Sequence, residues 1–321
     1  MSAPRVAFLV HPLMPWQRRV LGVRHMRPEL WRPGAAAGEM VSARIRCDTS
    51  QGPAEAIIIS VPALPAQLLR DQPAALELQV EAANRAAELG CQMIGLGSAL
   101  AVVAGRGQAL AERCAMPVTT GNASTAWAAA AITLEVCGDE PVGVLGFKGT
   151  VGDAVAGALA EHRTVYVVAT GRAARRAAQL GCRVVDLDEL LAKCRVIVGA
   201  STTGPQLQPG RLQPGTVLVD LALPATLAKG ERPAGVVELA GETLRWPGRV
   251  RGGAWGKLWL AFAGYGRGCV YACLAEPIAA ARTDQVPWSQ GRRLEVSAVK
   301  QAGRTLRDLG FEPVLIARRG P

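Results

Sequence analysis

Short apolar runs alternate with alanine-rich, amphipathic segments through residues 141–242 of the chain. The apolar runs, among them P-V-G-V-L, T-V-Y-V-V-A-T, R-V-I-V-G-A-S and T-V-L-V-D-L-A, are rich in valine. Strands buried on both faces of a parallel sheet have this composition. Segments with helical spacing, such as A-A-R-R-A-A-Q-L, separate the runs, and Gly181 follows that one as a C-cap. The alternation predicts an α/β fold with a Rossmann-type, doubly wound parallel sheet.

The bulk composition limits the class of protein. The chain has 321 residues, which favours two domains, and 50% of them are apolar, enough for cores that need no disulfide. The longest apolar stretch, W-A-A-A-A-I-T-L-E-V, is interrupted by Glu135 and is shorter than the ~20 residues that cross a bilayer. The N-terminal run V-A-F-L-V is too short for a signal peptide. We therefore expect a cytoplasmic protein without an integral membrane segment.

The cysteines and charges exclude other classes. The 8 cysteines are scattered without a C-x-x-C pair, and with only 3 histidines the sequence predicts no metal site and reduced thiols. The net charge of +10 is compatible with nucleic acid, a membrane surface or an acidic protein as partner. No basic block with interleaved aromatic residues occurs, so nucleic acid is not expected. A compositional bias toward arginine explains the charge equally well.

A glycine turn follows the first strand of the 141–242 region. Gly146, Gly149 and Gly152 form G-x-x-G-x-x-G at the entry to a helical segment, with Thr150 and Val151 between the last two glycines. Glycines at this place let the backbone turn tightly and approach a pyrophosphate at the helix N-terminus. The turn therefore predicts a dinucleotide site, although a plain strand-to-helix turn has the same pattern.

The end of the second strand indicates which dinucleotide binds. An NAD site carries a carboxylate there to bond the ribose 2′-hydroxyl. This chain reads A-T-G-R-A-A-R-R instead, with Thr170, Arg172, Arg175 and Arg176. Arginine suits a 2′-phosphate, so the sequence favours NADPH, with Thr170 and Arg172 as ligands. A solvated helix face would account for Arg175 and Arg176 as well.

Two later strand ends complete the predicted cofactor site. The third strand runs into G-A-S-T-T-G, with Ala200 and Ser201, and the fourth ends at Asp220. In a doubly wound sheet the ligand lies across the carboxyl ends of the strands. We therefore expect Ala200, Ser201 and Asp220 to lie near the dinucleotide.

The segment C-V-Y-A-C-L-A-E-P contains the candidate nucleophile. A cysteine thiolate can accept an acyl group from a thioester, and a reduced nicotinamide can then reduce the enzyme-bound thioester to an aldehyde. If the segment is helical, Cys269 and Cys273 share one face, and Pro277 bends or ends the helix because it offers no N–H to the carbonyl of Cys273. Both cysteines could equally be small buried hydrophobes.

Several blocks in the same order resemble the long-chain acyl-[acyl-carrier-protein] reductases, which form fatty aldehydes. T-T-G-N-A-S-T-A-W, from Thr119 to Trp127, resembles the family's T-T-G-N-x-x-T-A-Y/W, and L-G-F-K-G-T-V-G-D resembles its cofactor turn. C-V-Y-A-C-L-A-E resembles the family's F-A-C-F-A-E, which carries the acylated cysteine. Lys148, Thr150, Cys269 and Pro277 depart from the family pattern, as do residues 1–44.

The resemblance implies a fold like that of shikimate dehydrogenase and glutamyl-tRNA reductase, with the cofactor domain inserted in the chain. We expect an N-terminal α/β substrate domain at 1–122, an NADP-binding Rossmann domain at 123–245, and C-terminal helices at 246–321 that return to the first domain. The resemblance assigns the nucleophile to Cys273. It also implies that Thr119, Thr120 and Asn122 face the active-site cleft, although capping a helix is their alternative role.

The implied reaction is the NADPH-dependent reduction of a fatty acyl thioester to its aldehyde. The acyl donor is acyl carrier protein or acyl-coenzyme A, and a homo-oligomer is left open. Acyl carrier proteins are acidic, and two arginine groups could attract one: Arg18, Arg19, Arg24 and Arg27, or Arg292, Arg293, Arg304 and Arg307. An alcohol dehydrogenase like shikimate dehydrogenase and a non-catalytic NADP-binding module are the alternatives. The former is disfavoured because no lysine precedes Lys148.

Overall fold

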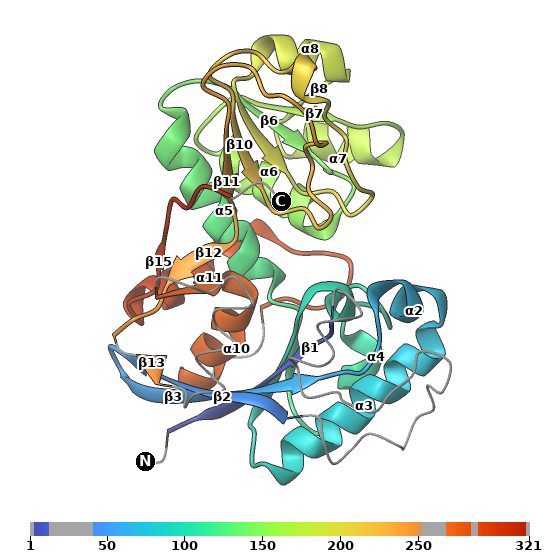
Figure 1. Ribbon diagram of the computed structural model, residues 1–321, viewed down its shortest axis with the longest axis vertical. Helices are drawn as coiled ribbons and strands as arrows, with labels where there is room; N and C mark the ends of the chain where they lie inside the picture. Colours follow the sequence, from blue (N-terminus) through green and yellow to red (C-terminus); the bar gives the residue numbers. More distant parts are fainter. Residues whose placement is uncertain (1–2, 13–40, 249, 252–267, 284–287, 319–321) are drawn as a thin grey trace. The chain divides into compact units, whose positions relative to one another are not determined.

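The structure is a computed structural model that describes residues 3–12, 41–248, 250–251, 268–283 and 288–318 (Figure 1). Arg18, Arg19, Arg24 and Arg27, one of the two expected arginine groups, lie outside these residues. The chain divides into two compact units, which are made of the following segments. The first unit comprises Met1–Gly121, Arg245–Arg293 and Arg304–Glu312, and the second comprises Asn122–Leu244, Leu294–Gly303 and Pro313–Pro321.

A six-stranded mixed sheet forms the centre of the first unit. The strands are β1 (Arg5–Val10), β2 (Val41–Thr49), β3 (Gly52–Ser60), β4 (Met93–Leu96), β5 (Val118–Thr119) and β13 (Val250–Arg251). They lie in the order β13-β2-β3-β1-β4-β5. The strands from β3 to β5 are parallel, while β2 and β13 run antiparallel to their neighbours. Thr119 lies on β5, at one edge of this sheet.

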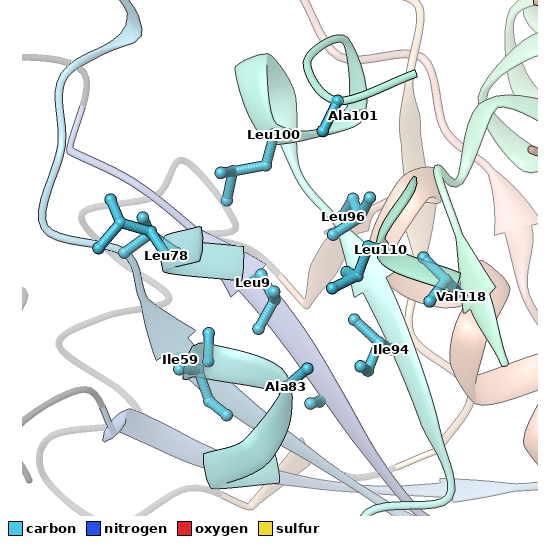
Figure 2. Packing of buried hydrophobic residues seen from close by; sticks show 14 of the residues in the cluster. Leu9, Ile59, Leu78, Ala83, Ile94, Leu96, Leu100, Ala101, Leu110 and Val118 are labelled. Carbon is cyan, nitrogen blue, oxygen red and sulfur yellow. The ribbon is translucent and has the colours of Figure 1, made fainter. Parts of the chain in front are cut away.

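Helices pack against this sheet. They are α2 (Pro65–Arg70), α3 (Gln72–Glu88), the short η2 (Ser98–Ala101), α4 (Gln108–Ala111) and α10 (Ala272–Arg282). Apolar residues of α3, such as Leu78, bury themselves against Leu9 and Ile59 of the strands (Figure 2). The helix α10 contacts β1, β3 and β4. Gly95 leaves room for it, because a Cβ there would lie 2.7 Å from Cγ of Pro277.

An unusual left-handed turn links η2 to α4. Four consecutive residues have positive φ angles: Ala104 (+50°), Gly105 (+69°), Arg106 (+57°) and Gly107 (+83°). Each non-glycine residue in this conformation costs about 1–2 kcal/mol. Hydrogen bonds hold the turn: the backbone N–H of Ala104 donates to Gln72 Oε1 at 2.9 Å, and the carbonyl of Arg106 accepts from the N–H of Gly291, also at 2.9 Å. Strained turns of this kind concentrate at functional sites.

The second unit confirms the expected doubly wound sheet. Its strands are β6 (Val142–Leu145), β7 (Val165–Val168), β8 (Arg183–Val185), β9 (Val196–Gly199), β10 (Val217–Asp220) and β11 (Val237–Ala240). All are parallel, in the order β11-β10-β9-β6-β7-β8. Read from the other edge, with the strands numbered along the chain, this is the Rossmann order 3-2-1-4-5-6. The order reverses between β6 and β9, where ligands bind in such sheets.

Helices connect and cover these strands. They are α5 (Asn122–Cys137), α6 (Thr150–Ala160), α7 (Arg172–Gln179), α8 (Leu187–Lys193) and the short η3 (Pro209–Arg211). The helix α5 packs against β9, β10 and α6, while α8 packs against β6 and β7. Gly143 permits that second contact, because a Cβ there would lie 2.6 Å from Cδ2 of Leu190.

The remaining elements belong to the C-terminal part of the chain. They are β12 (Thr243–Arg245), β14 (Cys269–Tyr271), α11 (Val296–Asp308) and β15 (Glu312–Pro313). The helix α11 is shared between the units, since its residues up to Gly303 group with the second and those from Arg304 with the first. Among the helices that the structure describes, none combines the length and the apolar character needed to cross a membrane.

Candidate functional site

Exposure separates two cysteines from the other six. All 8 cysteines of the chain are described; Cys114 and Cys273 are half-buried and the rest are buried. The thiol of Cys114 donates to the carbonyl of Met116 at 3.3 Å, and burial raises its pKa. Cys273 is the second residue of α10, where the helix N-terminus favours negative charge. Exposure and local electrostatics therefore both favour Cys273 as a nucleophile.

Gly121 lies directly against Cys273. Its φ is +71°, and a Cβ at this position would lie 2.4 Å from Cα, 2.5 Å from Cβ and 2.7 Å from the carbonyl oxygen of Cys273. Only glycine permits an approach this close, and the positive φ favours glycine for a second reason. The structure thus brings together T-T-G-N and A-C-L-A-E, the two blocks on which the family resemblance chiefly rests.

A buried carboxylate ties this turn to α10. Glu276 lies one helical turn after Cys273 and is 0% exposed. Its Oε1 accepts hydrogen bonds from the hydroxyl of Thr119 and, at 2.6 Å, from that of Ser289. Glu276 and Ser289 were not predicted as site residues, although the spacing of Glu276 from Cys273 places both on one helical face.

The two threonines have a supporting role in this network. The hydroxyl of Thr120 donates to Oγ of Ser289 at 3.1 Å, and its N–H donates to the carbonyl of Ser289 at 3.0 Å. The hydroxyl oxygen of Thr119 accepts from the N–H of Gly121 at 3.2 Å. Both threonine side chains are buried and their hydroxyls hold the turn beside Cys273, while the expectation that they face the active-site cleft stays a prediction. Asn122, the first residue of α5, belongs to the second unit.

The structure decides between alternatives left open for the cysteine segment. Cys269 lies on the strand β14 and is 3% exposed, so it does not share a helical face with Cys273. The helix does not end near Pro277 but continues through it to Arg282. Proline still has no N–H to offer the carbonyl of Cys273. Cys269 therefore has the environment of a small hydrophobe.

The predicted dinucleotide turn lies at the switch point of the second sheet. Gly146 follows β6 with a φ of +85°, and a Cβ there would lie 2.5 Å from the carbonyl carbon of Ala200, which follows β9. A Cβ on Gly152 would lie 2.4 Å from the carbonyl oxygen of Gly146. The two loops therefore pack backbone to backbone beside the start of α6, as the glycines of a dinucleotide-binding turn allow.

The other predicted cofactor residues are arranged around this turn. Gly149 is the N-cap of α6, and Thr150, Val151 and Gly152 form its first turn, the end of a helix that attracts negative charge. Ser201 is buried, and its hydroxyl lies 2.8 Å from that of Thr203.

The end of β7 carries the residues expected to select the cofactor. Thr170 and Arg172 are exposed directly after this strand, and Arg172 begins α7. Arg176, in contrast, lies 3.2 Å from a carboxylate oxygen of Asp153 in α6. Arg172 therefore remains the better candidate for a 2′-phosphate, while Arg176 connects two helices.

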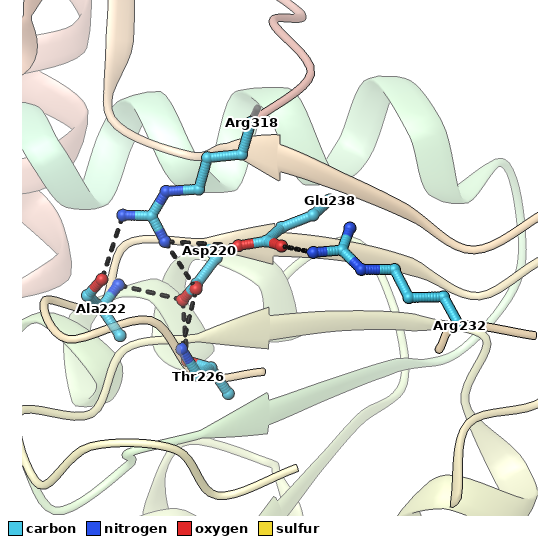
Figure 3. A network of polar contacts seen from close by, with 6 residues as sticks. All are labelled: Asp220, Ala222, Thr226, Arg232, Glu238 and Arg318. Atoms are coloured by element: carbon cyan, nitrogen blue, oxygen red, sulfur yellow. Dashed lines mark hydrogen bonds and ion pairs between the residues drawn. The ribbon is translucent and has the colours of Figure 1, made fainter. Parts of the chain in front are cut away.

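Asp220 is occupied by the protein itself. It is 0% exposed, and its carboxylate accepts from the N–H of Ala222 (3.0 Å), from the N–H (2.9 Å) and hydroxyl (2.7 Å) of Thr226, and from Arg318 (2.6 Å) (Figure 3). Arg318 also approaches Glu238, which in turn pairs with Arg232. This buried network leaves Asp220 no role as a direct cofactor ligand, so that prediction is wrong: Asp220 fixes the loop after β10 and the C-terminal segment.

Near this network lies another buried carboxyl group, that of Glu242. Oε2 of Glu242 is buried and has no hydrogen-bond partner among the described residues. Burial raises the pKa of Glu242 to about 7, against the opposing influence of the positive charge on Arg318. Its protonation therefore changes near neutral pH.

Comparisons with known proteins give distant similarities. No protein-family model matches the chain. Over 223 residues, 64% of the chain, it is 27% identical to a protein of Serratia sp. (strain ATCC 39006) named aminotransferase PigE. The chain spans about a quarter (26%) of the length of that relative, so the name describes a much longer protein.

Solved structures resemble the chain at low identity. Shikimate 5-dehydrogenase from Thermus thermophilus, in complex with NADP(H) and shikimate, is 17% identical over 94% of this chain and 98% of that chain, with a TM-score of 0.37. A 5,10-methylenetetrahydrofolate dehydrogenase from the silkworm Bombyx mori is 14% identical over 88% and 89%, with a TM-score of 0.40. The nucleotide-binding domain of glutamyl-tRNA reductase from Thermoplasma volcanium is 20% identical over 36% and 84%, with a TM-score of 0.30. At these levels the likenesses assign no activity.

Proposed function

We propose that the protein is an NADPH-dependent oxidoreductase that reduces a fatty acyl thioester to the fatty aldehyde through a thioester on Cys273. The observation that carries the proposal is the packing of Gly121 against the backbone of Cys273. This packing joins the T-T-G turn and the start of α10, the two segments whose sequences resemble those of the acyl-[acyl-carrier-protein] reductases. The exposure of Cys273 and its place at the start of α10 support the same role.

The reaction requires two transfers at one sulfur atom. The thiolate of Cys273 attacks the carbonyl carbon of the acyl donor, and the carbon–sulfur bond to the donor breaks, so that the donor leaves as a thiolate and takes up a proton. NADPH, held at the glycine turn of the second unit, would supply the hydride that reduces the acyl carbon. The bond between that carbon and Sγ of Cys273 then breaks, which releases the aldehyde and restores the thiolate.

The residues around Cys273 hold it in place for these transfers. Glu276 fixes the T-T-G turn through Thr119 and Ser289, and the turn in turn confines the backbone of Cys273 through Gly121. A misplacement of about 1 Å can cost a hundredfold in rate, so rigid support of the sulfur matters. We assign Glu276, Thr119, Thr120 and Ser289 as positioning residues.

The cofactor assignment follows from the second unit. The glycine turn after β6 and the start of α6 accommodate a pyrophosphate, with Gly146, Gly149, Thr150, Val151 and Gly152 around it. Thr170 and Arg172, exposed after β7, suit a 2′-phosphate, which favours NADPH over NADH.

The acyl donor is acyl carrier protein or acyl-coenzyme A. One of the two arginine groups lies among the residues that the structure describes, and all four of its side chains are exposed. Exposed positive charge of this kind would attract an acidic partner such as acyl carrier protein. The group comprises Arg292, Arg293, Arg304 and Arg307.

The test uses the two half-buried cysteines as a matched pair. Purified protein is incubated with palmitoyl-coenzyme A without NADPH, and its intact mass and tryptic peptides are measured. We expect one acyl adduct on Cys273 in the wild type and in Cys114→Ala, and none in Cys273→Ala. Cys273→Ala should also form no aldehyde when NADPH is present. An adduct on another cysteine, or aldehyde formation by Cys273→Ala at the normal rate, would exclude the proposed route.

Two outcomes would favour other functions. Oxidation of an alcohol with NADP⁺ and no acyl adduct would favour an alcohol dehydrogenase. Tight NADPH binding with neither reaction would favour a nucleotide-binding module.

A further inference from the structure

Two arginines of the unit that contains Cys273 lie on neighbouring backbone segments. Arg106 is part of the left-handed turn at Ala104–Gly107, and its carbonyl accepts from the N–H of Gly291 at 2.9 Å. Arg292 is the next residue along the chain. The side chain of Gln108 lies beside Gly291, since a Cβ on Gly291 would be 2.7 Å from its Nε2.

The environment of Arg106 is unfavourable for an isolated cation. Its side chain is half-buried, and both partial burial and the positive charge of Arg292 lower its pKa. Among the described residues no carboxylate lies within ion-pair distance of Arg106, although most arginines of the first sheet and its helices, such as Arg5 and Arg113, have one. Two guanidinium groups on neighbouring backbone segments can offer their donors to the oxygens of one phosphate group.

The same backbone segment reaches the site of the nucleophile. Ser289, two residues before Gly291, bonds to Thr120 and to Glu276, and Glu276 is on the helix that carries Cys273. The amide of Gln290 donates to the carbonyl of Val118, which precedes the T-T-G turn. The strained turn of Arg106 is thus linked through one short segment to the residues that position the sulfur.

We propose that Arg106 and Arg292 bind the phosphate of the pantetheine arm through which the acyl group is delivered. The inference rests on the proposed function and specifies its substrate. Coenzyme A and a carrier protein both present this phosphate, attached to the arm whose other end is the reacting thioester. The guanidinium groups offer fork-shaped donors that match phosphate oxygens, and Gln108, beside Gly291, offers an amide donor. Strain at Arg106 is then the means by which the fold holds the guanidinium group at this place.

The test compares two donors that differ by one phosphate. Palmitoyl-4′-phosphopantetheine and palmitoyl-pantetheine carry the same acyl group and the same arm. We measure kcat/KM for both with the wild type and with Arg106→Ala, Arg292→Ala and Arg106→Lys. We expect each alanine variant to lose about tenfold to a hundredfold with the phosphorylated donor, as for a lost hydrogen bond to a charged group, and to keep its rate with palmitoyl-pantetheine. Arg106→Lys, which keeps the charge but not the fork, should lose less.

A control removes one positive charge elsewhere. Arg46 is exposed on β2, and β3 and β1 separate β2 from β4, the strand that precedes the Arg106 turn. Arg46→Ala should leave kcat/KM unchanged with both donors. Arg292 is exposed, so Arg292→Ala tests the idea even if a change at the strained Arg106 position prevents folding.

Each outcome decides one question. Equal losses of kcat/KM with both donors, or no loss with either, would overturn the phosphate assignment. Turnover of palmitoyl-pantetheine by the wild type would still support the proposed function in that case. If the wild type reduces neither donor, the proposed function itself fails. Losses with both acyl-coenzyme A and acyl carrier protein would support the shared phosphate. A loss confined to the carrier protein would show that the arginines contact its acidic surface and would overturn the inference.

Discussion

Replacing Gly121 with alanine tests the contact that carries the proposed function. The new Cβ would lie 2.4–2.7 Å from three backbone and Cβ atoms of Cys273, whereas carbon atoms in contact prefer about 3.5–4.0 Å. The turn and the start of α10 must therefore move apart by about 1 Å, because no side-chain rotation relieves a clash with backbone. Overpacking of this kind costs about 1–3 kcal/mol, and the positive φ of +71° adds about 1–2 kcal/mol for a non-glycine residue.

Two measurements check this expectation. Gly121→Ala should lower the free energy of unfolding by about 2–5 kcal/mol in urea titrations. It should also slow acylation of Cys273 about a hundredfold, because the sulfur is displaced. Acylation is followed by intact mass after mixing with palmitoyl-coenzyme A.

A second glycine separates strain from the clash. Gly181 has a nearly identical φ of +76°, but a Cβ there would meet no atom within 4 Å. Gly181→Ala should therefore cost only the conformational share, about 1–2 kcal/mol, and leave acylation unchanged. If Gly121→Ala and Gly181→Ala behave alike in both assays, the contact with Cys273 does not position the nucleophile and the reasoning is refuted.

Three further predictions concern single side chains. Glu276→Ala should lose about 1–3 kcal/mol of stability, because it leaves the hydroxyls of Thr119 and Ser289 without their buried acceptor. Glu276→Gln keeps an acceptor oxygen and should lose less. Equal denaturation midpoints for the two variants would contradict this. Arg172→Ala should raise KM for NADPH about tenfold or more and leave KM for NADH nearly unchanged. Arg175→Ala, on the same helix, is the control and should leave both KM values nearly unchanged. Equal effects of Arg172→Ala on the two cofactors would count against the 2′-phosphate role. The pKa of Glu242 is raised to about 7 from an ordinary 4.5, so the folded state holds this proton more tightly than the unfolded state does. The contribution of Glu242 to stability is therefore complete below about pH 4.5 and is lost as the pH rises through 7. Between about pH 5 and about pH 8 the unfolding free energy of Glu242→Gln should therefore fall less than that of the wild type, by at most about 3 kcal/mol. Glu231→Gln, at an exposed position, is the control and should follow the wild type. Parallel curves for Glu242→Gln and the wild type would refute the raised pKa.

The sequence indicated the second unit well because its signals are local. Valine-rich runs, glycine turns and helical spacing act over a few residues, and the parallel order of the sheet follows from their alternation. The meeting of Gly146 with Ala200 is a consequence of that order, since both follow strands at the switch point.

Contacts between distant segments explain the errors. Asp220 has the position of a cofactor residue, but its partner Arg318 is 98 residues away and no local pattern indicates it. Cys269 was placed on a helix because the spacing from Cys273 allowed it, while C-V-Y, which has strand-forming valine and tyrosine, forms β14. The left-handed turn of Arg106 has one visible signal, the two glycines of A-G-R-G, but glycines alone do not specify φ at the arginine between them.

The central claim is that Cys273 carries the acyl group that becomes the aldehyde. The most direct measurement isolates the acyl-enzyme free of donor, adds NADPH, and follows the acyl mass on the Cys273 peptide together with aldehyde in a single turnover. The account predicts that the adduct disappears at the rate at which aldehyde forms, in a one-to-one ratio. An adduct that persists while aldehyde is made from added donor would contradict it.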